Sequence, residues 1–351
     1  MDIEKVGKAI AYLRKRAGYT QKDLADRIGI SDKAVSKWER GIGLPEIGYL
    51  RKLSILLDTD SDSLLAGDVV HHDNSWQGII VLEKNTYDIG AGTFIYDKPL
   101  INYLLSYFLL VGIKDITFIG AETDKDFILS RFGSGEEYGI KLSIVSGNLK
   151  DALKIRQWNG NIMMVYGRCF LYGVDQTRFF QKAMIDRDHF TMMVLPKKIE
   201  QETSHIIIDK DKKVINSNSD EPLRTQYDFS DIPIIFFPAS NLHEIAREAS
   251  ISKFLSDYAN NNDLYVQMLD RGFVEIEIDN WDNVHEASTF IKIVQDKCGM
   301  NVYCIEEVAW RRGFISIEKL KIHGERYSQT EYGVYIKSLY DRIKLSQSLG
   351  E

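Results

Sequence analysis

The sequence predicts a small all-α helix-turn-helix domain followed by an α/β three-layer sandwich with a mostly parallel sheet. Three observations lead to this fold class. Residues 1–57 carry helical periodicity alone, whereas from Trp76 onward short apolar runs alternate with helical stretches. The chain has 351 residues, which is enough for two domains. Its 44% hydrophobic and 27% charged residues are typical of a globular protein.

Residues 1–57 predict four short helices. The first helix is expected to end at Gly18, and the second to begin after Thr20, an N-cap with Asp23 in the capping-box position. The third follows the N-cap Ser31 and ends at Gly41. A three-residue turn between the second and third helices makes a helix-turn-helix. The expected core positions are Val6, Ile10, Leu13, Leu24, Ile28, Val35, Trp38, Leu50, Leu53, Leu56 and Leu57.

The sequence divides into a first domain of residues 1–67, a polar linker of residues 68–75 and a second domain of residues 76–351. Expected strands of the second domain are "GIIVL", "DITFIG", "KLSIVSG", "NIMMVYG" and "HFTMMVLP". Expected helices are "KPLINYLLSYFLLVGI", "DKDFILSRFG", "LKDALKIRQW" and "DQTRFFQKAMID". A two-stranded ribbon is expected around Asp209–Lys213. After Asn241 we expect helices, apart from one strand at "VEIEI".

The net charge of −7 is unevenly distributed along the chain, with +5 in residues 1–57 and −12 in the remainder. This asymmetry is typical of a nucleic-acid-binding module joined to a soluble domain. No apolar run approaches the ~18 residues that span a bilayer, and the charged N-terminus has no signal-peptide core. We therefore expect a cytoplasmic protein with no membrane contact. The three scattered cysteines lack metal-site spacing, and we expect no metal and no cofactor.

Residues 3–66 closely resemble the Cro and lambda-repressor family, also called the XRE family. The matching segments are "TQKDLA", "SDKAVSKWERG" and "PEIGYLRKL". The resemblance implies duplex DNA as partner, with Gln21 holding the backbone and the third helix in the major groove. Asp32, Lys33, Ser36 and Lys37 are then expected to face base edges or phosphates, and Arg40 is a further candidate that orients the turn together with Glu39. The alternative is a helical bundle used only for protein contacts.

The second domain contains few motifs of known chemistry. The loop "GAGT", from Gly90 to Thr93, is the one glycine-rich loop that follows a strand. It lacks the Lys-Ser/Thr of a P-loop and the third glycine of a dinucleotide-binding fingerprint, so it is either a weak phosphate-binding candidate or a simple turn. The sequence has no GxSxG and no HExxH motif. The residues alone thus assign no catalytic group.

Several segments of residues 76–340 resemble glucose-1-phosphate thymidylyltransferases, which form dTDP-glucose from dTTP and glucose 1-phosphate. They include "YDKPLINYLLSYFLLVGIKDI", "RFGSGEEYGIKLSIV", "HEASTFIKIVQDKCGMNVYCIEEVAWRRGFI" and "YGVYIKSL". The resemblance implies a sugar-nucleotidyltransferase fold, a homodimer or tetramer, and a sugar nucleotide or sugar phosphate as ligand. Paired with the first domain, such an oligomer is expected to bind a two-fold symmetric operator.

The departures from this family indicate lost catalysis. The glycine-rich loop after the first strand is about ten residues too short, and its arginine and lysine are missing. Arg168 replaces one metal-binding aspartate, Glu277 falls at the second, and Glu221 falls at the lysine that meets the sugar phosphate. Each loss typically costs ~3 kcal/mol or more of transition-state stabilisation. The candidate ligand-binding residues are Gly90, Gly92, Arg168, Glu221 and Glu277.

Arg168 itself has two interpretations. Its guanidinium either binds phosphate oxygens bidentately without a metal, or it pairs with Glu277 or another carboxylate and closes an empty site. For the whole chain the sequence favours a transcription regulator whose second domain oligomerises and senses a ligand, and which is not an enzyme. The alternatives are an active sugar-1-phosphate nucleotidyltransferase and a scaffold that binds an active thymidylyltransferase.

Overall fold

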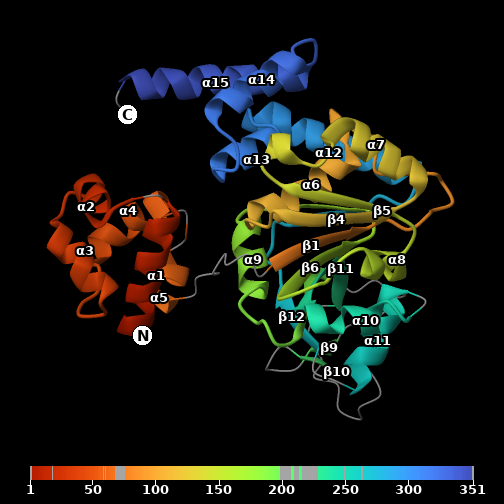
Figure 1. Ribbon diagram of the computed structural model, residues 1–351, viewed down its shortest axis with the longest axis horizontal. Coiled ribbons are helices and arrows are strands. Elements are labelled where there is room, and N and C mark those ends of the chain that lie inside the picture. The colour runs from red at the N-terminus through yellow and green to blue at the C-terminus, as the bar shows by residue number, and fades with distance from the viewer. Residues whose placement is uncertain are drawn as a thin grey trace. The chain divides into compact units, whose positions relative to one another are not determined.

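A computed structural model describes residues 2–17, 19–57, 59, 61–67, 76–197, 207–208, 213–215, 228–248, 250–261 and 264–349. The chain divides into two compact units, one made chiefly of residues 1–73 and the other of most of the remaining chain. Figure 1 shows the helical first unit and the sheet of the second unit. Each unit is described by itself below.

The first unit contains the four expected helices and a fifth where the sequence has a short apolar segment. Their bounds are α1 Ile3–Arg16, α2 Gln21–Ile28, α3 Asp32–Glu39, α4 Ile47–Leu57 and α5 Ser61–Ala66. The expected capping box is present, because Thr20 accepts from the Asp23 amide while the Asp23 carboxylate accepts from the Thr20 amide. The α1 C-cap is Ala17, and the predicted stop at Gly18 lies outside the described residues. The expected core positions are buried, except that Leu56 is half-buried.

The second unit is built on a seven-stranded sheet in the order β12-β8-β11-β6-β1-β4-β5. The register pairs make six strands parallel to one another and β11 antiparallel to both of its neighbours. The mostly parallel sheet predicted from the sequence is confirmed. The bounds are β1 Trp76–Val81, β4 Asp115–Gly120, β5 Lys141–Ser146, β6 Asn161–Tyr166, β8 Phe190–Lys197, β11 Asp228–Pro238 and β12 Leu264–Met268.

Two strands of this sheet were not predicted. The expectation of a single strand after Asn241 is wrong, because β12 forms there as well as β13, Val274–Glu277. The sequence analysis also missed β11, which carries Pro233 in its interior, and a proline argues against a central strand. The structure accommodates Pro233 with a register shift between Ile232 and Ile235 in the pairing with β8.

Smaller ribbons complete the strands. The predicted ribbon is confirmed in β9, Ile207–Ile208, which pairs antiparallel with β10, Val214–Ile215; residues 209–212 of its turn lie outside the described residues. A second ribbon joins β7, Cys169–Tyr172, to β13. A third joins β2, Phe94–Ile95, to β3, Lys98–Pro99. The strand β7 extends the chain directly beyond β6. Because Glu277 pairs with Cys169, the end of β13 lies beside the end of β6.

Helices cover both faces of the sheet (Figure 1) and complete the three layers. The four helices predicted between the strands are present as α6, α7, α8 and α9, and six more follow β11. The bounds are α6 Leu100–Leu110, α7 Glu122–Phe132, α8 Leu149–Ile155, α9 Gln176–Ala183, α10 Leu242–Ile245, α11 Ile251–Asn261, α12 Trp281–Cys298, α13 Ile305–Arg311, α14 Ile317–Arg326 and α15 Glu331–Leu349. None of the helices in the described ranges has the length and apolarity that a membrane span requires.

Candidate functional site

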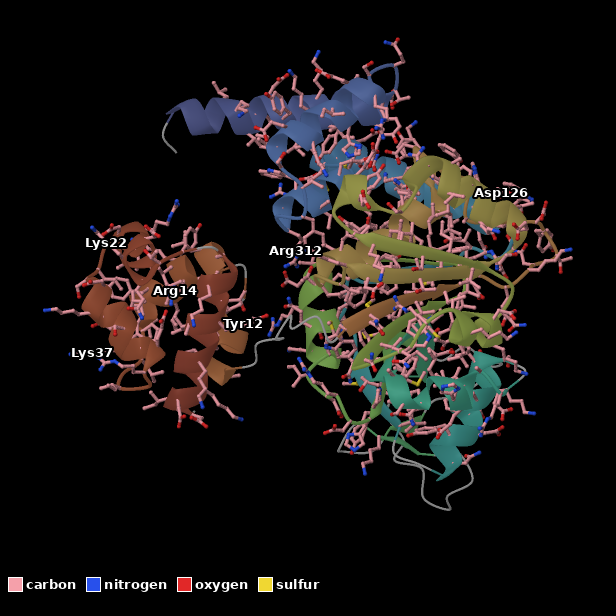
Figure 2. The ribbon with its side chains drawn as sticks, in the orientation of Figure 1. Tyr12, Arg14, Lys22, Lys37, Asp126 and Arg312 are labelled. Carbon is pink, nitrogen blue, oxygen red and sulfur yellow. The ribbon has the colours of Figure 1, made fainter. Side chains whose placement is uncertain are left out.

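Helix α3 presents a polar face to solvent. Lys33 and Lys37 are both exposed and lie one helical turn apart. Figure 2 shows Lys37 projecting away from the helical unit. Asp32 is the first residue of α3, and its carboxylate accepts a hydrogen bond from the Lys33 amide at 2.8 Å, which satisfies a free N–H of the first turn. Ser36 is half-buried on the same helix.

A buried carboxylate joins the first three helices. Glu39, the last residue of α3, accepts from the Arg14 guanidinium of α1 at 2.5 and 3.0 Å. It also accepts from the Gln21 side-chain amide of α2 at 2.7 Å. The side chains of Arg14 and Glu39 are only 9% and 7% exposed. Glu39 therefore fixes α3 relative to α1 and α2, and Gln21 is held at the start of α2 by the same carboxylate. Arg40 donates to the Ser36 carbonyl at 3.2 Å, within its own turn.

The glycine-rich loop of the second unit, residues 90–93, is hydrogen-bonded within itself and to helix α7. The Gly90 amide donates to the Thr93 hydroxyl at 3.0 Å, and the Ala91 amide donates to the Asp124 carboxylate of α7 at 2.6 Å. A Cβ on Gly90 would lie 2.4 Å from an Asp124 oxygen, so a larger residue would displace this carboxylate. Gly92 lies against the ring of Phe127. Two amides that could have bound a phosphate are thus already used, and the interpretation of this loop as a turn is favoured.

Arg168 follows the carboxyl end of β6, after Gly167. Its Nε donates to the Ile89 carbonyl at 2.5 Å, and one terminal nitrogen donates to the Glu83 carbonyl. Burial lowers the pKa of Arg168, and the nearby charges of Asp124 and Glu83 oppose that shift. The guanidinium thus connects the two ends of the short loop that leaves β1. The Asn85 side chain extends this connection by donating to the Asp279 carbonyl at 3.1 Å.

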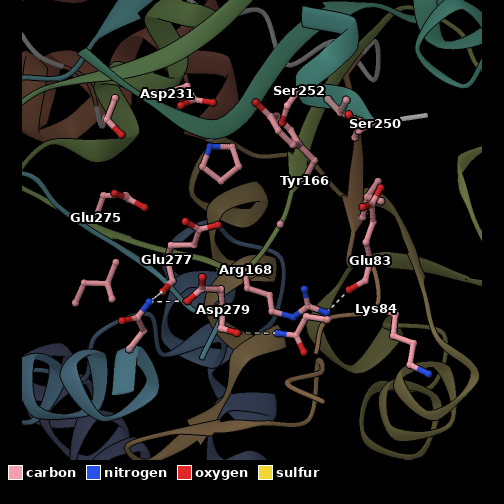
Figure 3. A pocket seen from close by; sticks show the side chains of 18 of the residues that line it. Glu83, Lys84, Tyr166, Arg168, Asp231, Ser250, Ser252, Glu275, Glu277 and Asp279 are labelled. Atoms are coloured by element: carbon pink, nitrogen blue, oxygen red, sulfur yellow. Dashed lines mark hydrogen bonds between the residues drawn. The ribbon is translucent and has the colours of Figure 1, made fainter. Parts of the chain in front are cut away.

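A cavity of about 630 Å³ opens beside Arg168 at the carboxyl end of the sheet (Figure 3). The structure brings Glu277 to this cavity, because β13 pairs with β7 and the Ile278 amide donates to the Arg168 carbonyl at 2.6 Å. Gly90 and Gly92 are not among the residues that line the cavity. Glu221 lies outside the described residues. Two of the sequence-predicted ligand residues, Arg168 and Glu277, therefore meet at one site.

The lining also contains residues that the sequence analysis did not single out. Asp231 comes from the missed strand β11, and Tyr166 ends β6. Asn283 of α12 donates to the Glu277 carbonyl and to the Asp279 carboxylate, each at 2.7 Å. For Asp279 and Asn283 the sequence offered one signal, because both lie in the largely polar segment "EIEIDNWDN".

The charge of the lining is strongly negative. Its described residues include only two cations, Lys84 and Arg168, and their formal charge sums to −4. The carboxylates are those of Glu83, Asp231, Glu275, Glu277, Asp279 and Glu286. Within the described part of the chain, no three His, Cys, Asp or Glu side chains gather closely enough to hold a metal ion. A guanidinium at the position where the resemblance expects a metal ligand does not fit a divalent cation.

We expect Arg168→Ala to lower the free energy of unfolding of the second unit by about 1–2 kcal/mol, because two carbonyls lose a charged donor. Amide exchange at Ile89, which donates to Asn85 at 2.9 Å, should become faster by about tenfold as the loop loosens. Hydrogen exchange with mass spectrometry measures both effects.

The matched control is Arg311→Ala. Arg311 pairs with Glu307 but its side chain is 63% exposed, so this change should alter stability by less than ~0.5 kcal/mol. Unchanged exchange at residues 83–89 in the Arg168 variant would contradict the anchoring role.

The two units of the chain resemble different known proteins. Residues 10–64 match a protein family described as "Helix-turn-helix". The glucose-1-phosphate thymidylyltransferase of Neisseria meningitidis is 29% identical over 259 residues, covering 70% of this chain and 90% of that enzyme. The corresponding enzyme of Mycolicibacterium smegmatis is 25% identical over 264 residues, covering 71% and 90%. A crystal structure from Bacillus anthracis, described as a glucose-1-phosphate thymidylyltransferase with sucrose, matches with a TM-score of 0.49 and 12% identity over 61% of this chain and 94% of that one.

Proposed function

Because the chain joins a helix-turn-helix DNA-binding domain to a domain homologous to glucose-1-phosphate thymidylyltransferases, we propose that it is a transcription regulator whose second domain no longer transfers nucleotides. The second domain oligomerises and binds a small ligand, for which the resemblance nominates a sugar nucleotide or sugar phosphate. A regulator of this kind acts on the chromosome, so the proposal places it in the cytoplasm.

The contacts of Arg168 are the observation that carries the loss of catalysis. Nucleotidyl transfer needs cations that neutralise the phosphates, and Mg²⁺ held by carboxylates supplies them. The resemblance puts Arg168 in place of one such carboxylate, and its guanidinium donates to the carbonyls of Glu83 and Ile89. A fixed positive charge repels a divalent cation, and the shortened loop offers no arginine for the triphosphate. These features support a pseudoenzyme over the active-enzyme alternative.

Oligomerisation follows from the requirements of DNA recognition. The first domain presents a single recognition helix, and domains of this type usually read two half-sites about one helical turn apart. We propose a homodimer or tetramer that binds a two-fold symmetric operator. The second domain is the natural oligomerisation domain, since it contains most of the chain.

The proposal is tested with one purified sample of the full chain. We expect salt-sensitive binding to a two-fold symmetric operator selected from random duplexes, and no pyrophosphate release from dTTP and glucose 1-phosphate with Mg²⁺. The Neisseria meningitidis enzyme serves as the positive control for release. Light scattering should give a dimer or larger.

Two outcomes would reject the proposal. Turnover comparable to the Neisseria enzyme would favour the active-enzyme alternative. Failure to select any duplex, together with co-purification of an active thymidylyltransferase from the native host, would favour the scaffold alternative.

A further inference from the structure

A second hollow lies between the end of α7 and the end of α14 (Figure 1). Its volume is about 780 Å³, within the ~300–1,000 Å³ usual for ligand pockets. None of its described lining residues lines the cavity beside Arg168. We propose that this hollow binds the anionic group of a small molecule, a phosphate or a carboxylate, through the guanidinium of Arg131. The inference rests on the proposed function in taking the ligand of the second domain to be a small molecule, and it assigns the anionic group to residues outside the sequence-predicted site.

Arg131 has no counter-charge paired with it among the residues that the structure describes. It stands in the last turn of α7, and its side chain is half-buried. Its Nε is buried and finds no hydrogen-bond partner in the described part of the chain, and no described carboxylate forms an ion pair with it. A guanidinium carries five N–H donors and no acceptor. A half-buried guanidinium without an acceptor is costly, and an anionic ligand would supply the acceptor.

Two aromatic rings hold this guanidinium in place. The Cζ of Arg131 lies 5.3 Å from the centroid of the Tyr327 ring and 5.8 Å from that of Phe132, both within the ~6 Å of a cation–π contact. The rings attract the positive charge, but the N–H groups stay available for the directed hydrogen bonds that an oxyanion accepts. Because the side chain is positioned before a ligand arrives, less of its conformational freedom is lost on binding.

The two carboxylates of the described lining have other cations beside them. Both terminal nitrogens of Arg326 donate to the Glu137 carboxylate, at 2.5 and 2.8 Å, and these hydrogen bonds lower the pKa of Glu137. Glu136 is exposed, and the Nζ of Lys319 donates to its main-chain carbonyl at 3.2 Å. The positive charge of Arg131 is thus added to a region whose other charges balance, and an anionic group on the ligand matches it.

The rest of the lining supplies a hydroxyl donor and an apolar wall. Ser134 is exposed on the loop after α7, and its hydroxyl is able to donate to an oxyanion. Phe127 and Leu129 line the same hollow, and Leu129 is 55% exposed. Apolar walls with a few polar groups are typical of small-molecule sites. This set of side chains would recognise a phosphate and a carboxylate by the same chemistry, so the experiment includes both.

Calorimetry on the full chain without Mg²⁺ tests the inference. The probes are glucose 1-phosphate, glucuronate, inorganic phosphate and glucose. We expect at least one of the two anionic sugars to bind about tenfold or more tightly than glucose, and the stronger of the two identifies the anionic group. Arg131→Gln should weaken that binding about tenfold or more. Arg131→Lys, which keeps the charge and loses the planar fork of donors, should weaken it about threefold.

The matched control is Lys154→Gln, which removes one positive charge from α8 at a side chain that is 74% exposed. It should leave the affinity for the anionic sugar unchanged. Equal binding of glucose and the anionic sugars, or no binding of any probe, would overturn the inference. Loss of binding in Arg168→Gln with full binding in Arg131→Gln would also overturn it, because the anion would then bind in the cavity beside Arg168.

Operator binding is measured on the same sample, so that failure of the anion site is distinguished from failure of the proposed function. Binding to duplex DNA but to no anionic probe rejects the site at Arg131 and leaves the regulator proposal standing. Anion binding that depends on Arg131, without binding to any duplex, supports the site and rejects the regulator proposal.

Discussion

Replacing Lys33 and Lys37 together with alanine should lower the affinity for duplex DNA by about 100-fold. Both lysines are exposed on α3, one turn apart, in the helix that the helix-turn-helix family places in the major groove. A contact to a base edge is worth about 1–3 kcal/mol, and two such contacts together give this factor. If one lysine contacts a phosphate instead, removing it should reduce the slope of log K for DNA binding against log salt concentration by about one.

Fluorescence anisotropy at several salt concentrations measures both quantities. The control is the double change Lys141→Ala with Lys321→Ala, which removes the same charge from exposed positions of the second domain and should alter affinity by less than about threefold. Equal DNA binding by the isolated fragment of residues 76–351 would show that α3 is not the reading helix.

Replacing Glu39 with alanine should destabilise the first domain by about 3–5 kcal/mol, since it leaves a buried guanidinium without its counter-charge. Arg14 is 7% exposed and donates two hydrogen bonds to that carboxylate. The same change frees Gln21, which donates to Glu39 at 2.7 Å. A loss of this size approaches the whole stability of a small domain, so DNA binding should disappear with it.

Hydrogen exchange of the full chain resolves the effect, because the amides of α1, α2 and α3 report on the first domain separately. The control is Glu4→Ala, which breaks the Lys8–Glu4 pair. Both side chains of that pair are more than 70% exposed, and an exposed pair contributes less than ~1 kcal/mol. If the amides of α1, α2 and α3 exchange equally fast in the Glu39 and Glu4 variants, the hydrogen bonds of Glu39 do not stabilise the domain.

The first domain was predictable from local signals. A cap at Thr20 or Ser31 acts within three residues, and the apolar periodicity of a helix acts within one turn, so neighbouring residues suffice to locate α1 to α4. The central strands β1, β4, β5 and β6 were recognised for a similar reason, since buried parallel strands are continuous apolar runs. Where the local signal conflicted with the tertiary environment, as at Pro233 in β11, the prediction was wrong.

The sequence by itself determined that an arginine follows β6 and that a carboxylate stands at Glu277. Only the tertiary structure decided their partners. Arg168 contacts the carbonyls of Glu83 and Ile89, which precede it in the chain by 85 and 79 positions. The pairing of β7 with β13 brings Glu277 to the same cavity. Hydrogen bonds and charges act through a few ångströms of space, whereas a sequence pattern reports only on neighbours in the chain. The charge of a cavity is therefore set by the fold that gathers its residues.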